Sequence, residues 1–288
     1  MNQFCSICNG SSFEPFLSTK DYYFSQEKFQ ILRCTSCGLR ITSPQPSESE
    51  IGKYYNSENY ISHNSEAKGL INRIYSAVQK LNFKLKFKAL NKHVPRGTWM
   101  DYGAGNGAFL SYLKDQKIDA IGYEPSSDAR KTAPDEIQLS DTSDYSHDTK
   151  TYACITMWHV LEHVHELRKL LNQHRNHLIE KGLLVIAVPN IDSYDASFYK
   201  EHWAALDTPR HLWHFNEKNI RDLAKDLNME LIKVKPMIFD SFYVSLLSAQ
   251  YKKSSKLVAV MVGLLSNLKA FFSKHPYSSQ IYLLRKNS

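Results

Sequence analysis

A glycine-rich turn between a short apolar strand and a helix is the feature that most restricts how this chain can fold. Residues 98–102 form a short apolar run, the turn 103–107 reads Gly-Ala-Gly-Asn-Gly, and residues 108–114 have a helical pattern. This order lets backbone N–H groups and a helix N-terminus approach a ligand closely. The spacing Gly103-x-Gly105-x-x-Ala108 also satisfies the dinucleotide fingerprint. The turn alone therefore predicts a nucleotide-like ligand without identifying it.

Further apolar segments predict the rest of an α/β sheet. Residues 120–124 form a second strand that ends in Glu124, an acid placed to take both hydroxyls of a ribose. Buried-looking strands follow at 152–157 and 183–189. The pattern then predicts an amphipathic helix at 219–227, followed by strands at 230–239 and 279–285.

The order of these motifs resembles that of class I S-adenosylmethionine-dependent methyltransferases. Asp-x-Gly-x-Gly-x-Gly at 101–107 is followed by Tyr-Glu-Pro at 123–125, Val-Leu-Glu-His-Val at 160–164 and Val-Pro-Asn at 188–190. The chain is most similar to the broad ubiquinone-methyltransferase-like group, which includes sugar methyltransferases. The chain further resembles those members of the group that carry a cysteine-paired front module. This likeness lies in Tyr54-Tyr55 and in the segment 209–215. The resemblance implies a seven-stranded Rossmann-like sheet with helices on both faces and an antiparallel pair of strands at its edge.

The resemblance also implies S-adenosylmethionine as cofactor, with the glycine loop beneath its methionine and ribose. Glu124 would bind the ribose, and Asp141 is placed to meet the adenine edge. Trp158 and His159 leave a strand at its carboxyl end, where open α/β sheets bind ligands, so one of them is expected to line the methyl-donor pocket. The predicted cofactor-binding residues are Asp101, Tyr102, Gly103, Ala104, Gly105, Gly107, Glu124, Pro125, Asp141, Trp158 and His159.

Four of the five cysteines form two short pairs, Cys5-x-x-Cys8 and Cys34-x-x-Cys37. Four thiolates suit tetrahedral Zn²⁺, and Gly38 suits the left-handed turn of such a site. Disulfides are the alternative, which a reducing cytosolic setting disfavours. Because four sulfur ligands leave no open coordination position, we predict a structural zinc in a ribbon-like module over residues 1–45. The weak charge of this module argues against nucleic-acid binding.

The remaining chain is expected to hold a linker and amphipathic lid helix at 46–95, then the methyltransferase domain at 96–288 with a helical insertion at about 241–276. Three tyrosines of the linker are predicted to contact substrate, with packing between module and core as the alternative: Tyr54, Tyr55 and Tyr60.

Methyl transfer to a hydroxyl or carbon acid requires removal of a proton, and histidine is the usual base near neutral pH. The segment 207–215 follows the fifth strand at the ligand edge and holds two histidines, an arginine and two aromatic residues. We hypothesise that His211 or His214 is the base and that Arg210 holds an anionic substrate group; closure of the core by bulky side chains is the alternative. His163 is a further catalytic candidate, or a residue of a cap or core hydrogen bond.

Two other histidines, His174 and His177, lie in a polar helical stretch and are expected on the surface. The formal charge of +7 is concentrated at the end of the chain, where residues 241–288 hold seven basic residues and no acidic one. This excess indicates either solvated helix faces or attraction to an acidic substrate or membrane surface. A dimer interface or a cover for the sheet is an equal alternative for the insertion, and the oligomeric state is not predicted.

No secretory signal or membrane-spanning stretch is predicted, so a cytoplasmic location is expected. The expected acceptor is a small metabolite, first a sugar nucleotide or polysaccharide-precursor sugar, and second a quinone-like or lipid-linked molecule. The rival classes are an NAD-dependent oxidoreductase, a non-catalytic scaffold that keeps the fold, and a zinc-ribbon enzyme that methylates nucleic acid.

Overall fold

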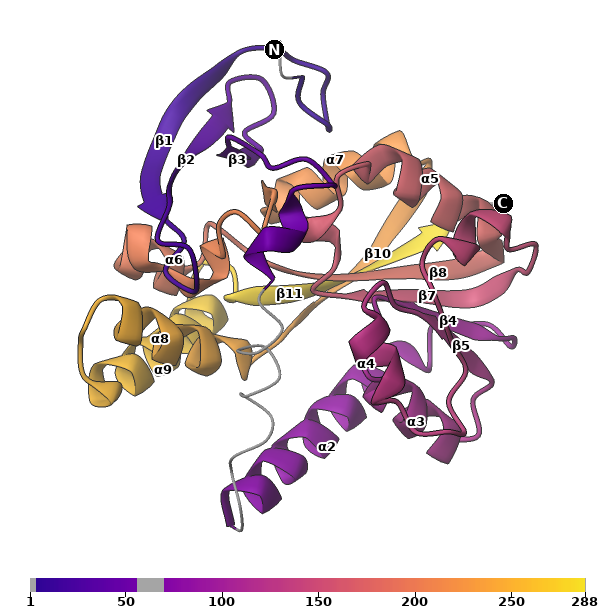
Figure 1. The fold of residues 1–288 in the computed structure, drawn as a ribbon. Coiled ribbons are helices and arrows are strands. Elements are labelled where there is room, and N and C mark those ends of the chain that lie inside the picture. Colours follow the sequence, from indigo (N-terminus) through magenta and orange to yellow (C-terminus); the bar gives the residue numbers. More distant parts are fainter. Residues whose placement is uncertain (1–3, 56–69, 288) are drawn as a thin grey trace.

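The computed structural model describes residues 4–55 and 70–287, without the side chains of 70–78, and contains two β-sheets with flanking helices (Figure 1). The larger sheet has the strand order β10-β11-β8-β7-β4-β5-β6. Its inner strands are parallel, whereas β11 runs antiparallel to both β8 and β10. The seven-stranded α/β fold predicted from the sequence is thereby confirmed. The strands are β4 (Trp99–Tyr102), β5 (Ala120–Tyr123), β6 (Leu139–Ser140), β7 (Tyr152–Trp158), β8 (Leu178–Pro189), β10 (Met229–Pro236) and β11 (Ser279–Lys286).

Strand β8 shows why the central strands are continuously apolar. Leu184, Ile186 and Val188 belong to one buried cluster, and the alternating residues Leu183, Val185 and Ala187 belong to another. Successive side chains of a strand point to opposite faces, so both faces of this strand are covered. Helices α2 (Leu70–Leu90) and α3 (Ala108–Asp115) lie on one face, and α5 (Leu167–His177) and α7 (Glu217–Asp226) on the other (Figure 1).

Strand order reverses between β4 and β7, because β5 lies on one side of β4 and β7 on the other. The connections that leave the carboxyl ends of these strands therefore diverge and open a crevice, which is where doubly wound sheets bind ligands. The described residues also form the short helix α4 (Ser127–Lys131) and five short 3-10 helices that follow strands or join helices: Ile51–Tyr54, Asp144–His147, Leu161–His163, Lys200–His202 and Ala204–Leu206.

The second sheet is antiparallel and has the order β1-β2-β3-β9. Its first three strands, β1 (Phe13–Lys20), β2 (Lys28–Cys34) and β3 (Arg40–Ser43), come from the front of the chain, but β9 (Trp213–His214) comes from the segment after β8. Ile41 pairs with Trp213, and both belong to the same buried cluster as the core of the larger sheet. The front segment is therefore joined to the rest of the chain by strand pairing and by a shared core.

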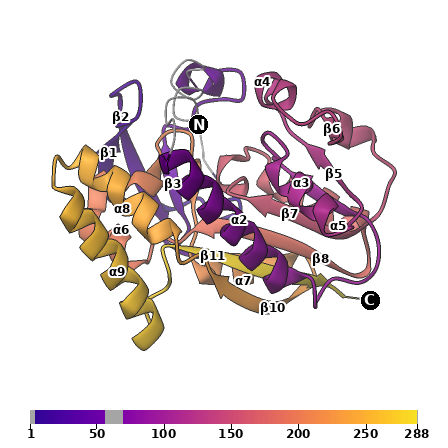
Figure 2. The same ribbon diagram turned by 90° about the horizontal axis from the view of Figure 1, so that it is seen from below.

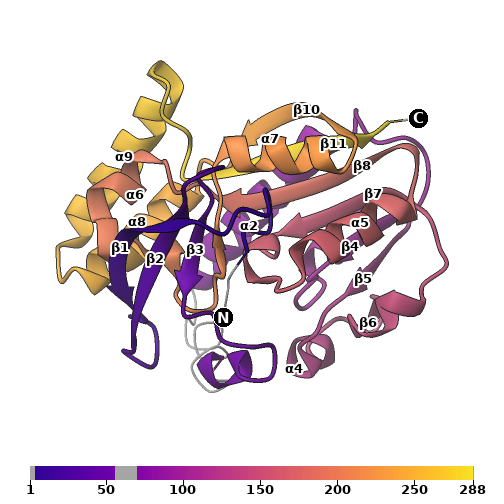
Figure 3. The ribbon, with the colours of Figure 1, turned by 90° about the horizontal axis from the view of Figure 1, so that it is seen from above.

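The chain between β10 and β11 forms a pair of helices, α8 (Asp240–Tyr251) and α9 (Lys256–Phe272), packed beside α6 (Tyr194–Tyr199). Figures 2 and 3 show α9 at the end of the molecule opposite β5 and β6. Within the described ranges, no helix combines the length and hydropathy needed to cross a bilayer.

Two details differ from the sequence predictions. Helix α7 begins at Glu217 and not at Asn219, because the side chain of Asn216 accepts a hydrogen bond from the Asn219 backbone and Asn219 reciprocates as the third residue of a capping box. The surface position predicted for His174 is wrong, since the residue is fully buried and its Nδ1 lies 2.8 Å from the Tyr145 hydroxyl. Burial lowers the pKa of His174 to about 3, so a neutral ring fills this part of the core.

Candidate functional site

The glycine turn after β4 has a conformation that favours glycine at three positions, since Gly103, Gly105 and Gly107 all have positive φ. A Cβ on Gly103 would lie 2.4 Å from Val160 Cγ2, so the turn packs directly on the segment that follows β7. A Cβ on Gly105 would meet no atom within 4 Å. The turn is thus closed toward the protein and open where a ligand would approach its backbone.

Glu124, at the end of β5, faces this open side of the turn. Its Oε2 accepts a hydrogen bond from the Gly105 backbone N–H at 2.8 Å, and its Oε1 accepts one from Ser126 N–H at 2.9 Å. These bonds fix the orientation of a carboxylate that is only 8% exposed. Each oxygen keeps a further lone pair, so the group can accept hydrogen bonds from two adjacent ribose hydroxyls.

Asp101 lies at the end of β4 beneath the turn. Its Oδ1 accepts a hydrogen bond from Thr156 Oγ1 at 2.5 Å. Burial raises the pKa of Asp101 to about 7, although the Thr156 hydrogen bond and the charge of Lys86 oppose this shift. Burial therefore disfavours the charged carboxylate, and Thr156 and Lys86 partly restore it.

Lys86 is a residue of the site that the sequence analysis missed. Its ammonium lies 4.0 Å from the centroid of the Trp158 ring, and the residue is 9% exposed. Burial lowers the pKa of Lys86 to about 8, against the attraction of Asp240 and Asp101. A signal existed in the sequence, because Lys86 shares the helical face of Phe83 and Leu90, which pack into the core.

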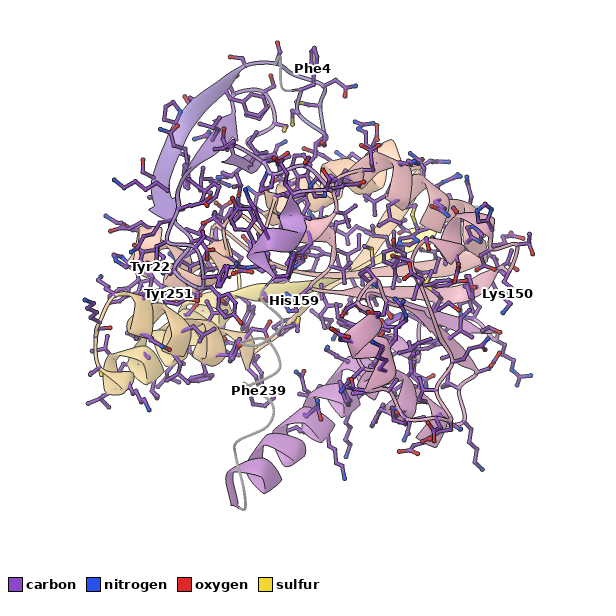
Figure 4. All side chains as sticks on the ribbon, in the orientation of Figure 1. Phe4, Tyr22, Lys150, His159, Phe239 and Tyr251 are labelled. Carbon is purple, nitrogen blue, oxygen red and sulfur yellow. The ribbon has the colours of Figure 1, made fainter. Side chains whose placement is uncertain are left out.

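His159 follows β7 with a φ of 56° and is held between two carboxylates. Its Nε2 lies 3.0 Å from Asp240 Oδ2 and its Nδ1 lies 3.3 Å from Glu162 Oε1. Burial opposes its charge, but the hydrogen bonds to Asp240 and Glu162 outweigh that effect and raise the pKa of His159 to about 10. Figure 4 shows His159 near the centre of the molecule, where this cation neutralises the buried Glu162 and ties α8 to the end of β7.

His163 and His211 meet just beyond this point, with ring centroids 4.5 Å apart in an edge-to-face arrangement. His163 Nδ1 lies 3.0 Å from the Arg210 carbonyl and 3.0 Å from the Tyr55 hydroxyl, whereas His211 Nδ1 lies 2.9 Å from the Ala205 carbonyl. A carbonyl can only accept, so each Nδ1 carries the proton and each Nε2 keeps a lone pair. Burial and the neighbouring His211 lower the pKa of His163 to about 4.

The ligand atoms of Glu162, His163 and His211 lie within 4.8 Å of one another. Two imidazole nitrogens and one carboxylate oxygen are suitable ligands for a divalent transition metal. The Nδ1 contacts with backbone carbonyls match the arrangement that orients histidine ligands in metal sites. These three residues, besides the four front cysteines, could therefore hold a metal ion.

Arg210 and His214 form hydrogen bonds with other groups of the protein. Arg210 is 4% exposed and donates to Asp21 Oδ1 at 3.0 Å, Asp207 Oδ1 at 2.7 Å and the Tyr54 carbonyl at 3.1 Å. His214 Nε2 lies 3.0 Å from Thr42 Oγ1 inside the second sheet, where burial and His211 lower its pKa to about 3. This geometry favours His211 over His214 as a base and assigns the Arg210 donors to the protein itself.

The other predicted site residues are spread around the crevice. Asp141 forms an ion pair with Arg130 at 2.8 Å and lies beyond β6, and the Tyr102 ring packs edge-on against His174. The Tyr54 hydroxyl donates to Glu27 at 2.6 Å and so faces the second sheet, whereas Tyr55 reaches His163. Ala104 lies within the turn and Pro125 follows Glu124, whereas Tyr60 lies outside the described residues.

The four front cysteines converge although they come from two separate loops. Cys5 Sγ lies 3.4 Å from Cys37 Sγ, Cys8 Sγ lies 3.5 Å from Cys34 Sγ, and all four sulfurs fall within 4.8 Å. Tetrahedral zinc with Zn–S bonds near 2.3 Å separates its sulfurs by about 3.8 Å, so the arrangement fits such an ion. No disulfide joins these cysteines. Burial opposes ionisation of Cys34, but backbone N–H groups of Cys37 and Ser36 outweigh it and lower the pKa of Cys34 to about 7.

A seven-stranded sheet with an antiparallel β11 next to its edge, this crevice and a glycine turn matches the fold of class I S-adenosylmethionine-dependent methyltransferases. Comparison with known families agrees, because a model described as a methyltransferase domain matches residues 74–234. The chain belongs to this methyltransferase family. The match decides against the NAD-dependent oxidoreductase.

Individual relatives are distant. An uncharacterized protein of Methanocaldococcus jannaschii is 21% identical over 160 residues, which cover 54% of this chain and 76% of the relative. The magnesium protoporphyrin IX methyltransferase of Synechocystis, solved with bound S-adenosylhomocysteine, has a TM-score of 0.54 at 12% identity over 84% of this chain and 100% of its own. A SAM-dependent methyltransferase of Archaeoglobus fulgidus has a TM-score of 0.50 at 15% identity, covering 72% and 94% of the two chains. At such identities the solved structures show the shared fold alone.

Proposed function

We propose that this methyltransferase acts on a small hydroxyl-bearing metabolite, first a sugar nucleotide or polysaccharide-precursor sugar. The observation that carries the proposal is the His163–His211 pair, which lies past the end of β7 with one unprotonated nitrogen on each ring. Tyr55 adds a hydroxyl beside His163. The resemblance to sugar methyltransferases in the motifs around these residues supports a hydroxyl-rich acceptor.

His211 is the proposed base. Bound S-adenosylmethionine supplies an electrophilic sulfonium methyl group. His211 Nε2 accepts the proton of the acceptor hydroxyl as the oxygen–methyl bond forms and the sulfur–methyl bond breaks, which leaves the neutral thioether. The Ala205 carbonyl fixes the required tautomer of His211, and Asp207 Oδ2, 3.9 Å from Nε2, stabilises the imidazolium that results.

The substitution His211→Gln is expected to lower kcat by about 10²- to 10⁴-fold, because it removes the general base and keeps a side chain of similar length. Affinity for S-adenosylmethionine is expected to stay within about twofold, measured by calorimetry. The exposed His147→Gln variant serves as the matched control and should retain full turnover. A His211→Gln enzyme with wild-type turnover would rule out this base.

The acceptor is tested with methyl-labelled cofactor and separate pools of sugar nucleotides, lipid-linked sugars and quinone-like phenols. Label transferred to a sugar nucleotide, and retained after removal of the nucleotide, is the expected result. Label found only in a phenol or in lipid-linked material would replace the proposed acceptor while leaving the class of enzyme unchanged.

We also propose that Cys5, Cys8, Cys34 and Cys37 hold one structural Zn²⁺. Metal analysis of the purified chain is expected to find about one zinc ion per chain. The substitution Cys34→Ser is expected to reduce this zinc content and to lower the melting temperature. The buried Cys154→Ser variant is the control, because its thiol lies in β7, away from the cluster, and its loss should leave the zinc content unchanged. The proposal would be contradicted if protein without zinc had the same melting temperature as protein with zinc.

A further inference from the structure

Helix α9 presents a wide apolar face to solvent. Its buried residues Ala259, Val262, Gly263 and Ser266 form one face and pack on the neighbouring helices. The exposed large apolar side chains recur at helical spacing on the outer face: Leu257, Val260, Met261, Leu264, Leu265, Leu268, Phe271 and Phe272. Phe271 and Phe272 are 72% and 78% exposed. Soluble proteins rarely expose contiguous apolar patches of this kind without a partner.

Basic residues flank this face at both ends of the helix. Lys252, Lys253 and Lys256 precede or begin α9, and Lys274 lies beyond its end, whereas Lys269 is turned toward α6, with its Nζ 3.9 Å from the centroid of the Tyr194 ring. Residues 241–288 contain no acidic residue. An apolar face bordered by lysines matches the surface of a bilayer that contains anionic lipids, where acyl chains meet negatively charged headgroups.

A second copy of this chain fits the face less well. In a two-fold symmetric contact the same surface meets itself, so the lysines of one copy would approach those of the other. No carboxylate within residues 241–288 is available to compensate this repulsion. Charge therefore favours an anionic surface over self-association.

We propose that the outer face of α9 docks on the surface of an anionic phospholipid bilayer. The helix lies in the plane of the interface and does not cross it, because its other face is committed to α6 and α8. The docked helix pair also reaches the end of β7, since α8 packs on α9 and begins at Asp240, whose carboxylate lies 3.0 Å from His159 Nε2. The inference does not depend on the identity of the acceptor.

The test is sedimentation of the full chain with vesicles of phosphatidylcholine alone or mixed equally with phosphatidylglycerol. We expect binding to the anionic vesicles that weakens as salt is raised. The variant Lys252→Gln/Lys253→Gln/Lys256→Gln should reduce partitioning on the order of 100-fold, at the usual contribution of each lysine near such a surface. The variant Leu257→Gln/Leu264→Gln/Phe272→Ser should abolish it.

Control variants change the same number of lysines or of apolar residues elsewhere on the surface: Lys28→Gln/Lys114→Gln/Lys150→Gln and Phe4→Ser/Phe16→Ser/Phe24→Ser, all at exposed positions. These variants should bind vesicles like the wild type, and all variants should bind S-adenosylmethionine normally. Absence of vesicle binding by the wild type, or equal binding by the apolar variant, would overturn the proposal. Concentration-dependent dimerisation that the apolar variant abolishes, without vesicle binding, would assign the face to a second copy instead.

Discussion

The substitution Glu124→Gln is expected to weaken S-adenosylmethionine binding by about 10- to 100-fold. A carboxylate held by two backbone N–H groups can accept hydrogen bonds from both ribose hydroxyls. A glutamine amide offers only one accepting oxygen, and its NH₂ group would face a backbone donor. The loss of charge-assisted hydrogen bonds, each contributing about 1.5–3 kcal/mol, accounts for this range.

Calorimetric titration with S-adenosylmethionine measures the effect, and circular dichroism checks that the fold is retained. Glu136→Gln, an exposed acid on the segment before β6, is the matched control and should bind normally. Unchanged affinity in Glu124→Gln would remove Glu124 from the cofactor site and place the ribose elsewhere along the turn.

The substitution Arg210→Leu is expected to lower the free energy of unfolding by about 3–5 kcal/mol, because it leaves the charge of Asp21 buried without its partner. Asp21 is fully buried, and Arg210 joins it to Asp207 and to the Tyr54 carbonyl. Burial opposes the charge of Asp21, but Arg210 and the backbone of Ser25 outweigh it and lower the pKa of Asp21. The carboxylate therefore stays ionised and depends on this arginine.

Urea unfolding at neutral pH measures the change. Arg221→Ala is the control, because its ion pair with Glu217 is exposed and should contribute less than about 1 kcal/mol. Equal stability of Arg210→Leu and the wild type would show that the Asp21 hydrogen bonds to the Tyr23, Phe24 and Ser25 backbone suffice.

The larger sheet and its glycine turn could be predicted because their signals are local. The strands are short apolar runs, and the turn needs positive φ where the sequence has Gly103, Gly105 and Gly107. The cysteine pairs are equally local. The convergence of the two pairs within 4.8 Å agrees with the predicted grouping but identifies no ion.

The partners of the site residues could not be predicted, because they depend on long-range packing. Asp240 is 81 residues from His159 in sequence, and Asp21 is 189 residues from Arg210. Sequence position made Arg210 a candidate for substrate binding, whereas tertiary contact reveals a buried ion pair. The same reason explains the wrong prediction for His174. Its polar helical stretch indicated a surface position, but the residue lies in the core. The domain boundaries, the cytoplasmic location and the substrate contacts of Tyr54 and Tyr60 stay predictions.

The pairing of β3 with β9 has a consequence for how this chain can be divided. Strand β9 supplies the last strand of the front sheet, and Thr42 Oγ1 donates to the His211 carbonyl at 2.6 Å. The front segment is therefore not a unit that can be exchanged between enzymes, because its removal would leave β9 without its partner β3 and loosen the loop that carries His211. A truncated or chimeric enzyme would have to keep both β3 and β9 to hold the loop of His211 in place.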